Sequence, residues 1–424
     1  MHVGFHLPRD NHIKLFAPLV ELLLGKGCEV SILCDHRVKA KKMGIKAYQF
    51  PSVEKVPKFK YAPKICVFNS VGELAGIVKQ NKIDVVFFVN FPPLSSQLKT
   101  LLAKENYFFI TAEMQHYYDI MLLEKDISVV DVIYCYSKSW VESWKEYVAK
   151  HKQILGKSKE NYFQEIDSKI RLVGFPVISQ VGEYDRNSIR EKYNMPLDKK
   201  VVLLMPFPKF SSVWIDSVYR PQSKFLKKAK LIFKGAKEYL PDVEKGIDDL
   251  AVTRGLREFC DKNNALLVTK GRIKNPVPKY VEKMSDRIFF DDCFHPYFTL
   301  ELLAIADLSV SFCSMVVLES IAIGTPSICI MPHEDRIWQP YEVLGLPSEF
   351  KMGKGSIYNF PGVAYMKSAE HMSRRFGHET FEDYEIEPLC KSGYVEKFFG
   401  FNDFEACSRI YADLCQRLGH KNQS

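Results

Sequence analysis

Several features that mark particular classes of protein are missing from this chain of 424 residues. Its 11 cysteines form no CxxC pair and no Cys/His spacing of a zinc site, so neither a disulfide framework nor structural zinc is expected. No apolar run approaches the roughly 18 residues of a membrane-spanning helix, and the first residues have no signal-peptide pattern. We therefore expect a cytoplasmic protein with reduced cysteines, whose membrane contact is at most peripheral, at the inner face of the membrane.

A strong charge of one sign is also missing. Lysine and arginine number 59 against 51 acidic residues, and the excess of +8 is spread along the chain. No RRM, KH, zinc-finger or helix-turn-helix pattern accompanies this excess, so nucleic-acid binding is not expected. The composition, with 46% hydrophobic and 26% charged residues, is that of an ordinary globular protein, and the length predicts two domains of about 200 residues.

Short apolar runs alternate with amphipathic stretches along both halves of the chain, which predicts an α/β protein with parallel sheets covered by helices. The expected strands are 1–7, 29–34, 85–89, 107–111, 132–136 and 170–173 in the first half, and 201–205, 265–268, 288–290, 308–311 and 327–331 in the second. The expected helices include 12–24, 299–306 and one that starts at Ser314. We expect irregular insertions at 207–250 and 341–394, and a linker shortly after Gly174.

The stretch from His295 to Met331 carries polar residues where a strand should pass into a helix. Ser314 falls at the predicted helix start, where backbone amides can bind a phosphate, and Glu319 could accept bonds from ribose hydroxyls. The alternative is that Ser311 and Ser314 only cap the helix and that Glu319 is a surface residue. The residues alone leave both interpretations open.

The same stretch resembles a known family. A strand, a serine-rich loop, a helix with Glu319 and then Gly324 and Pro326 resemble the donor-binding half of GT-B glycosyltransferases. The segment 1–35 resembles their first strand, loop and helix, with Asn11 and His12 where a glycine–histidine pair often occurs. The segment 170–205 is similar to their interdomain crossing. Within this superfamily the chain is most similar to enzymes of surface polymers, namely CDP-glycerol glycerophosphotransferases, Kdo transferases and UDP-GlcNAc 2-epimerases.

The resemblance implies two Rossmann-like domains facing across a cleft. Residues 1–175 would form the acceptor domain, 176–400 the nucleotide-donor domain, and 401–424 a helix that crosses back to the first domain, followed by the tail. An apolar face made of Phe404, Ile410, Tyr411 and Leu414 suits such a helix.

The resemblance also implies which residues bind the donor. Lys270 and Arg272 occupy the place where related transferases carry a Lys-Pro-His-Pro element, and either cation could hold donor phosphates. Phe294 and His295 lie where relatives hold the nucleobase, although core packing is the commoner use of an aromatic side chain such as Phe294. Lys209 follows the first strand of the donor domain, and the alternative is that it is an ordinary exposed lysine. These residues join Ser311, Ser314 and Glu319 as the expected donor site. No Asp-x-Asp element stands at a strand end, so neither a metal nor a cofactor is expected.

The catalytic base is expected in the first half of the chain. The segment 111–119, TAEMQHYYD, resembles the Gln-His-Gly loop of polymer-forming relatives, with Tyr117 in place of glycine. This implies that His116 removes the proton from the acceptor hydroxyl. Glu113, Asp10 and His12 are the rival bases, and a purely structural role for His116 is the alternative.

The predicted function is transfer of a sugar or an alditol phosphate from a nucleotide-activated donor to a cell-surface glycan. The expected partners are a nucleotide-sugar or CDP-alditol donor and a glycan or lipid-linked acceptor. Two alternatives remain, a hydrolysing UDP-GlcNAc 2-epimerase and a catalytically silent binding protein of the same fold.

Overall fold

The computed structural model describes fourteen stretches of the chain, which are 1–8, 12–37, 58–89, 94–102, 108–112, 129–142, 145, 159–205, 248–272, 277–291, 295, 297–312, 314–331 and 354–421. The chain divides into two compact units. The first unit contains Met1–Gly182, Cys293–Phe298 and Glu396–Ser424, and the second contains Glu183–Asp292 and Thr299–Val395. No helix within the described stretches is long and apolar enough to span a membrane.

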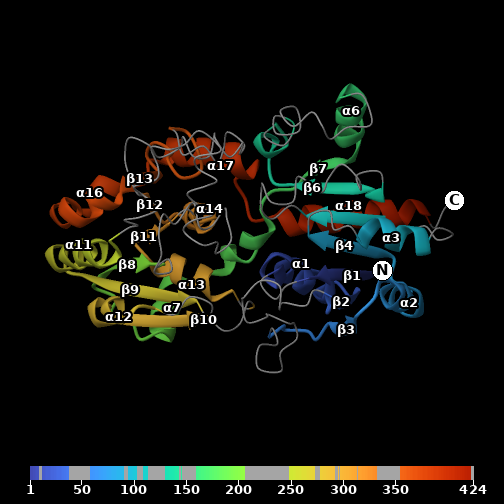
Figure 1. Ribbon diagram of the computed structural model, residues 1–424, viewed down its shortest axis with the longest axis horizontal. Helices are drawn as coiled ribbons and strands as arrows, with labels where there is room; N and C mark the ends of the chain where they lie inside the picture. The colour runs from blue at the N-terminus through green and yellow to red at the C-terminus, as the bar shows by residue number, and fades with distance from the viewer. Residues whose placement is uncertain are drawn as a thin grey trace, which may run out of the picture. The chain divides into compact units, whose positions relative to one another are not determined.

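The first unit is built on a parallel sheet with strand order β3-β2-β1-β4-β5-β6-β7 (Figure 1). Its strands are β1 (His2–Leu7), β2 (Glu29–Asp35), β3 (Lys64–Phe68), β4 (Val85–Val89), β5 (Phe108–Ala112), β6 (Val132–Cys135) and β7 (Ile170–Leu172). The chain runs from β1 outward to β3 and then returns to the other side of β1 with β4. This is the Rossmann order, in which ligands bind at the carboxyl ends of the strands where the direction reverses.

Alternation along the strands directs side chains to two helical layers. Phe87 of β4 stacks on Phe5, and both contact Phe16 of α1 (Ile13–Gly25). Val86 and Phe88 of the same strand belong to a core cluster with α2 (Val71–Gln80) and α3 (Leu94–Leu101). The described residues of this unit also form α6 (Lys159–Lys169) and α18 (Ala406–Lys421), and α18 packs against α1.

The second unit has a parallel sheet of order β10-β9-β8-β11-β12-β13. Its strands are β8 (Lys200–Leu204), β9 (Ala265–Arg272), β10 (Arg287–Asp291), β11 (Leu308–Ser311), β12 (Ser327–Met331) and β13 (Ala364–Ser368). This is again the Rossmann order, with the reversal between β8 and β11. An apolar cluster packs α11 (Asp249–Lys262), α12 (Lys279–Met284) and α16 (Ala369–Arg374) on one face. The unit also contains α7 (Arg186–Lys192), α14 (Val316–Ile323) and most of α13 (Phe298–Ile305) and α17 (Pro388–Phe399).

The structure confirms the α/β prediction and corrects three details of it. The stretch 341–394 is not irregular throughout, because its described part forms β13, α16, two 3-10 helices and the start of α17. Strand β3 was not predicted, because it is an edge strand on which Ile65 and Val67 are 40% and 41% exposed, so its pattern is not that of a buried strand. Strand β9 continues beyond Val268 to Arg272, and thus includes Lys270. The predicted insertion 207–250 lies outside the described residues up to 247.

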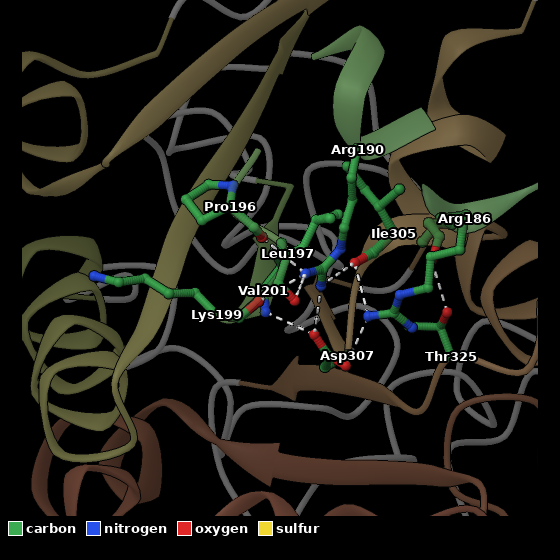
Figure 2. A network of polar contacts seen from close by, with 10 residues as sticks. Arg186, Arg190, Pro196, Leu197, Lys199, Val201, Ile305, Asp307 and Thr325 are labelled. Atoms are coloured by element: carbon green, nitrogen blue, oxygen red, sulfur yellow. Dashed lines mark hydrogen bonds and ion pairs between the residues drawn. The ribbon is translucent and has the colours of Figure 1, made fainter. Parts of the chain in front are cut away.

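A buried arginine fastens the amino end of the second sheet (Figure 2). Arg190 of α7 donates to the carbonyl oxygens of Pro196, Leu197 and Lys199, at 2.9, 3.2 and 2.9 Å, in the turn that leads into β8. The same guanidinium reaches Asp307, 3.3 Å away, which also accepts a bond from the backbone amide of Val201. Because this network lies where β8 and β11 begin, it holds the fold at the edge opposite to the expected ligand-binding edge.

Candidate functional site at the carboxyl edge of the second sheet

Three side chains, those of Lys270, Met205 and Ser311, lie at the same level near the point where the strand order of the second sheet reverses. Thr269, Leu204 and Val310 are paired across the neighbouring strands β9, β8 and β11, so Lys270, Met205 and Ser311 follow them at the carboxyl edge. Side chains at the same level of a parallel sheet share a face, and strands are spaced about 4.8 Å apart. Lys270 and Ser311 therefore lie on one face with their backbones roughly 10 Å apart. This separation suits groups that approach a diphosphate from two sides.

Ser311 is the buried polar group of this edge. Its side chain is 1% exposed, and its Oγ has no hydrogen-bond partner in the described part of the chain. A buried hydroxyl without a partner costs about 1–3 kcal/mol, so Ser311 offers at the carboxyl edge a hydrogen-bonding group whose capacity is unused within the described residues. The interpretation of Ser311 as a helix cap finds no hydrogen bond to support it.

Ser314 stands at the start of α14 and engages the helix directly. Its Oγ accepts a long bond of 3.4 Å from the Val316 amide, and its carbonyl accepts from the Val317 amide at 3.1 Å. Gly324 ends the helix in the left-handed conformation, with φ +98°, as the sequence predicted from its glycine and proline. Ser314 therefore bonds to the first turn of α14, whose N-cap residue is Met315, and the amides at this helix start are those that an anion would approach.

A chain of hydroxyl groups fixes α14 on the sheet. Ser309 of β11 lies 2.8 Å from Ser320 of α14 and 2.9 Å from Ser327 of β12, and Ser320 donates to the Thr325 carbonyl. Glu319 precedes Ser320 and is only 2% exposed, so it is not a surface residue. The helix start and its carboxylate are therefore held in one position relative to the strand ends.

The two predicted cations of this edge differ in how far they are described. Lys270 is 8% exposed within β9, level with Met205. Arg272 ends the same strand, but its side chain lies outside the described atoms, as do Lys209 and Phe294 as whole residues.

His295 belongs to the segment that is part of the first unit. Its Nε2 lies 3.0 Å from a carboxylate oxygen of Glu21 on α1, and its ring packs 4.7 Å from that of Phe59. Burial lowers the pKa of His295, although the Glu21 carboxylate raises it. Two residues further on, Tyr297 accepts a bond from Lys14 at 3.3 Å. The described contacts of His295 are thus with α1 and with the chain that precedes β3.

Of the predicted bases, only His12 is described. It directly precedes α1, the helix that follows β1 in the chain. Asp10, Glu113 and His116 lie outside the described residues, and Glu113 follows the last residue of β5 in the sequence.

The sequence analysis missed a buried charged cluster in the first unit. His6 of β1 and Asp35 at the end of β2 have side chains only 1% exposed, and their Nε2 and Oδ2 atoms are 3.1 Å apart. Arg37 donates to the same carboxylate through its Nε at 2.9 Å and its Nη2 at 2.7 Å. Burial favours the protonated carboxyl, but the bonds from His6 and Arg37 hold the pKa of Asp35 well below its usual range. The signal in the sequence was a histidine inside an apolar strand, HVGFHL.

Comparison with known proteins identifies the fold. No protein-family model and no curated protein matches the sequence. The wall teichoic acid polymerase TagF is similar in structure, with 12% identity, a TM-score of 0.56 and coverage of 100% of this chain and 90% of that chain. The Neisseria meningitidis UDP-GlcNAc 2-epimerase bound to UDP-GlcNAc has 11% identity, a TM-score of 0.54 and coverage of 98% and 100%. S. aureus MnaA, in its co-structure with UDP, has 13% identity, a TM-score of 0.51 and coverage of 99% of this chain and 97% of that chain. The chain therefore has the GT-B fold, with two Rossmann-like domains and a C-terminal helix that returns to the first, as the resemblance implied.

Proposed function

We propose that this protein is a metal-independent glycosyltransferase, which moves a sugar or an alditol phosphate from a nucleotide-activated donor to a cell-surface glycan acceptor. The observation that carries the proposal is the buried Ser311 hydroxyl without a partner, at the strand reversal of a Rossmann sheet. The similar structures support a nucleotide-activated donor, because one is bound to UDP-GlcNAc, one is a co-structure with UDP and one is a polymerase of wall teichoic acid.

The second unit offers groups that suit a nucleoside diphosphate. The Ser311 hydroxyl and the amides at the start of α14 would donate to phosphate oxygens, and Lys270 would approach from two strands away. Negative charge grows on the leaving phosphate in the transition state, so donors that are already in place lower the barrier. Glu319 would accept bonds from the ribose, and Lys209, Arg272, Phe294 and His295 remain proposed donor contacts.

The proposed base acts on the acceptor. In this proposal His116, as a neutral imidazole, accepts the proton of the acceptor hydroxyl. The oxygen of that hydroxyl attacks the activated carbon or phosphorus of the donor, and the nucleotide leaves. Glu113, Asp10 and His12 are the other candidates for this role. The acceptor is proposed to be a glycan or a lipid-linked chain, and the enzyme to work in the cytoplasm, at the inner face of the membrane.

Replacing Ser311 tests the donor site in two ways. Ser311→Ala should weaken binding of the nucleotide roughly 10- to 100-fold, because a hydrogen bond to a charged group is lost. The same change should raise the unfolding free energy of the ligand-free protein by about 1 kcal/mol, because a buried hydroxyl without a partner is removed. Calorimetric titration and denaturant unfolding measure the two effects.

A matched control uses a serine on helix α16. Ser373 donates to the Glu370 carbonyl within its own helix, α16, so Ser373→Ala should leave nucleotide affinity unchanged. If Ser311→Ala loses stability and keeps its affinity, the hydroxyl is a structural group and the proposed donor site is wrong.

A hydrolysing UDP-GlcNAc 2-epimerase is the second candidate, because two UDP-GlcNAc 2-epimerases, from Neisseria meningitidis and Methanocaldococcus jannaschii, are similar in structure over 100% of their own chains. The two functions differ in their need for an acceptor. A transferase consumes the donor substantially only when an acceptor is present, whereas the epimerase releases UDP and a changed hexosamine from UDP-GlcNAc and water. Chromatography of UDP-GlcNAc incubated with the enzyme alone separates them.

A further inference from the structure

The cluster of His6, Asp35 and Arg37 lies at the ligand-binding edge of the first unit. His6 is the penultimate residue of β1 and Asp35 is the last of β2, so both lie at the carboxyl ends of strands near the reversal between β1 and β4. In dinucleotide-binding sheets of this order, the residues that follow the second strand contact a ribose or its phosphate. The sequence between β1 and α1, from Pro8 to His12, contains no glycine, which excludes the glycine-rich pyrophosphate cradle of those proteins.

The Asp35 carboxylate is fully used inside the protein. Its Oδ1 accepts from the backbone amide and the Nε of Arg37, at 3.0 and 2.9 Å, and its Oδ2 accepts from Arg37 Nη2 and His6 Nε2, at 2.7 and 3.1 Å. A carboxylate offers about four lone-pair positions, and these bonds occupy them. Asp35 therefore has no capacity left for a ribose hydroxyl or a cation.

The same contacts leave Arg37 aimed outward. Its guanidinium lies 5.7 Å from the centre of the Phe68 ring, and its side chain is 27% exposed. With Nε and one Nη2 hydrogen bound to Asp35, the Nη1 hydrogens and the second Nη2 hydrogen face away from the carboxylate. No other carboxylate pairs with this guanidinium among the residues that the structure describes. Two parallel N–H groups held by a rigid partner match two oxygens of a phosphate or a carboxylate.

His6 bonds to the Asp35 carboxylate from the buried interior of the sheet. It lies 5.3 Å from the Phe88 ring and 5.9 Å from the Phe68 ring, and its Nδ1 is buried without a hydrogen-bond partner in the described chain. Burial lowers the pKa of His6, against the effect of Asp35, so the ring is neutral at pH 7 and its Nε2–H donates to the carboxylate. A neutral histidine leaves the full charge of Asp35 to hold the Arg37 guanidinium.

We propose that Arg37, held by Asp35 and His6, is an oxyanion-binding residue of the first unit, which takes a phosphate or carboxylate group of the acceptor. The oxyanion site stands on the geometry of these three residues, whereas its assignment to the acceptor rests on the proposed function. The acceptor would then be an anionic chain, such as a polyol phosphate, a lipid phosphate or an acidic glycan. Arg37 would position the acceptor and would take no part in proton transfer.

Protection of Arg37 from chemical modification tests the site in the full chain. Phenylglyoxal condenses with two guanidinium nitrogens, and peptide mass spectrometry reports the rate at each arginine. Inorganic phosphate and acetate are the probes, with sodium chloride at equal ionic strength as the reference. Modification of Arg37 should slow about twofold when the probe reaches its dissociation constant, and further above it, by mass action.

Arg417 is the matched control within the same unit. Its side chain is 23% exposed and its Nε donates to Asp413 at 2.8 Å, but it lies on α18 rather than at the strand ends. Protection of Arg37 by phosphate alone identifies a phosphate site, by acetate alone a carboxylate site, and by both a general oxyanion site. Asp35→Asn, which frees the guanidinium, should abolish the protection; should this variant not fold, the wild-type measurement alone decides.

Two results would overturn the inference: no protection of Arg37 by either probe, or equal protection of Arg417. Neither result touches the donor site, because nucleotide binding is measured separately. If the protein binds nucleotide but the probes do not protect Arg37, the proposed function stands and the anionic acceptor is ruled out. If the protein binds no nucleotide but the probes protect Arg37, the oxyanion site stands and its assignment to an acceptor is wrong.

Discussion

At the scale of single residues, two arginines of α7 share partners but differ in burial. Arg190 has a side chain only 5% exposed, and besides Asp307 it satisfies four backbone carbonyls, those of Pro196, Leu197, Lys199 and Ile305. Arg186, one turn earlier, also reaches Ile305 and Asp307, but it is 44% exposed (Figure 2). Water can replace the contacts of Arg186 and cannot easily replace those of Arg190.

Arg190→Met should therefore destabilise the second unit by about 3 kcal/mol, since it leaves several carbonyl oxygens without their donor and removes one of the donors to Asp307. Arg186→Met is the matched control and should cost less than about 1 kcal/mol, as exposed ion pairs do. Urea unfolding of both variants measures the difference. Equal losses would mean that the burial of Arg190 contributes nothing.

Only some of these polar residues could be predicted from the sequence. Ser311, Ser314 and Glu319 could be singled out because polar residues interrupt an apolar strand–helix pattern within one short segment. Arg190 and the His6, Asp35 and Arg37 cluster could not, because their partners come from other strands and loops. For His6 and Asp35 the separation is 29 residues, and it is 117 for Arg190 and Asp307. Such pairings depend on strand order, which the residue pattern alone does not fix.

At the scale of elements, the contact between α11 and α16 depends on a residue with no side chain. A Cβ added to Gly255 of α11 would lie 1.9 Å from the carbonyl oxygen of Met372, well inside contact distance. Backbone atoms cannot move aside as the end of a flexible side chain can. The glycine is therefore a packing requirement, although glycine weakens the interior of a helix.

Gly255→Ala should destabilise the protein by about 1–3 kcal/mol, because α11 and α16 must separate. Gly76 of α2 is the contrast, because a Cβ there would meet nothing within 4 Å. Gly76→Ala should stabilise by about 0.5–1 kcal/mol through its better helix propensity. Thermal or denaturant unfolding gives both signs, and a stabilising Gly255→Ala would contradict the close approach of the two helices.

Elements buried on both faces were the predictable ones. Strands such as β4, β8 and β12 are continuous apolar runs, and α14 has a glycine at its end, so their bounds follow closely from the sequence. Strands β3 and β13 escaped prediction because β3 is partly exposed, the middle of β13 is only half-buried, and both contain a lysine among apolar residues. Partial burial removes the periodic signal on which the prediction depends.

At the scale of the whole molecule, the two Rossmann strand orders and the returning C-terminal segment account for the likeness to GT-B enzymes. Helix α18 is held within the first unit by Ile410 and Leu414, each 1% exposed, and by the 2.7 Å bond from Tyr134 to Asp413. The sequence predicted this helix from its apolar face and from the family resemblance. The activity does not follow from the fold, because one fold carries many chemistries.

Binding of a nucleotide to the purified protein tests the central claim most directly. Calorimetric titration with CMP, CDP, UDP and GDP should give saturable binding of one base in preference to the others, and Ser311→Ala should weaken it. That result would support a nucleotide-activated donor and name its base. If the folded protein binds none of these nucleotides or their sugar conjugates, the second unit is not a donor site and the protein is not a transferase of this kind.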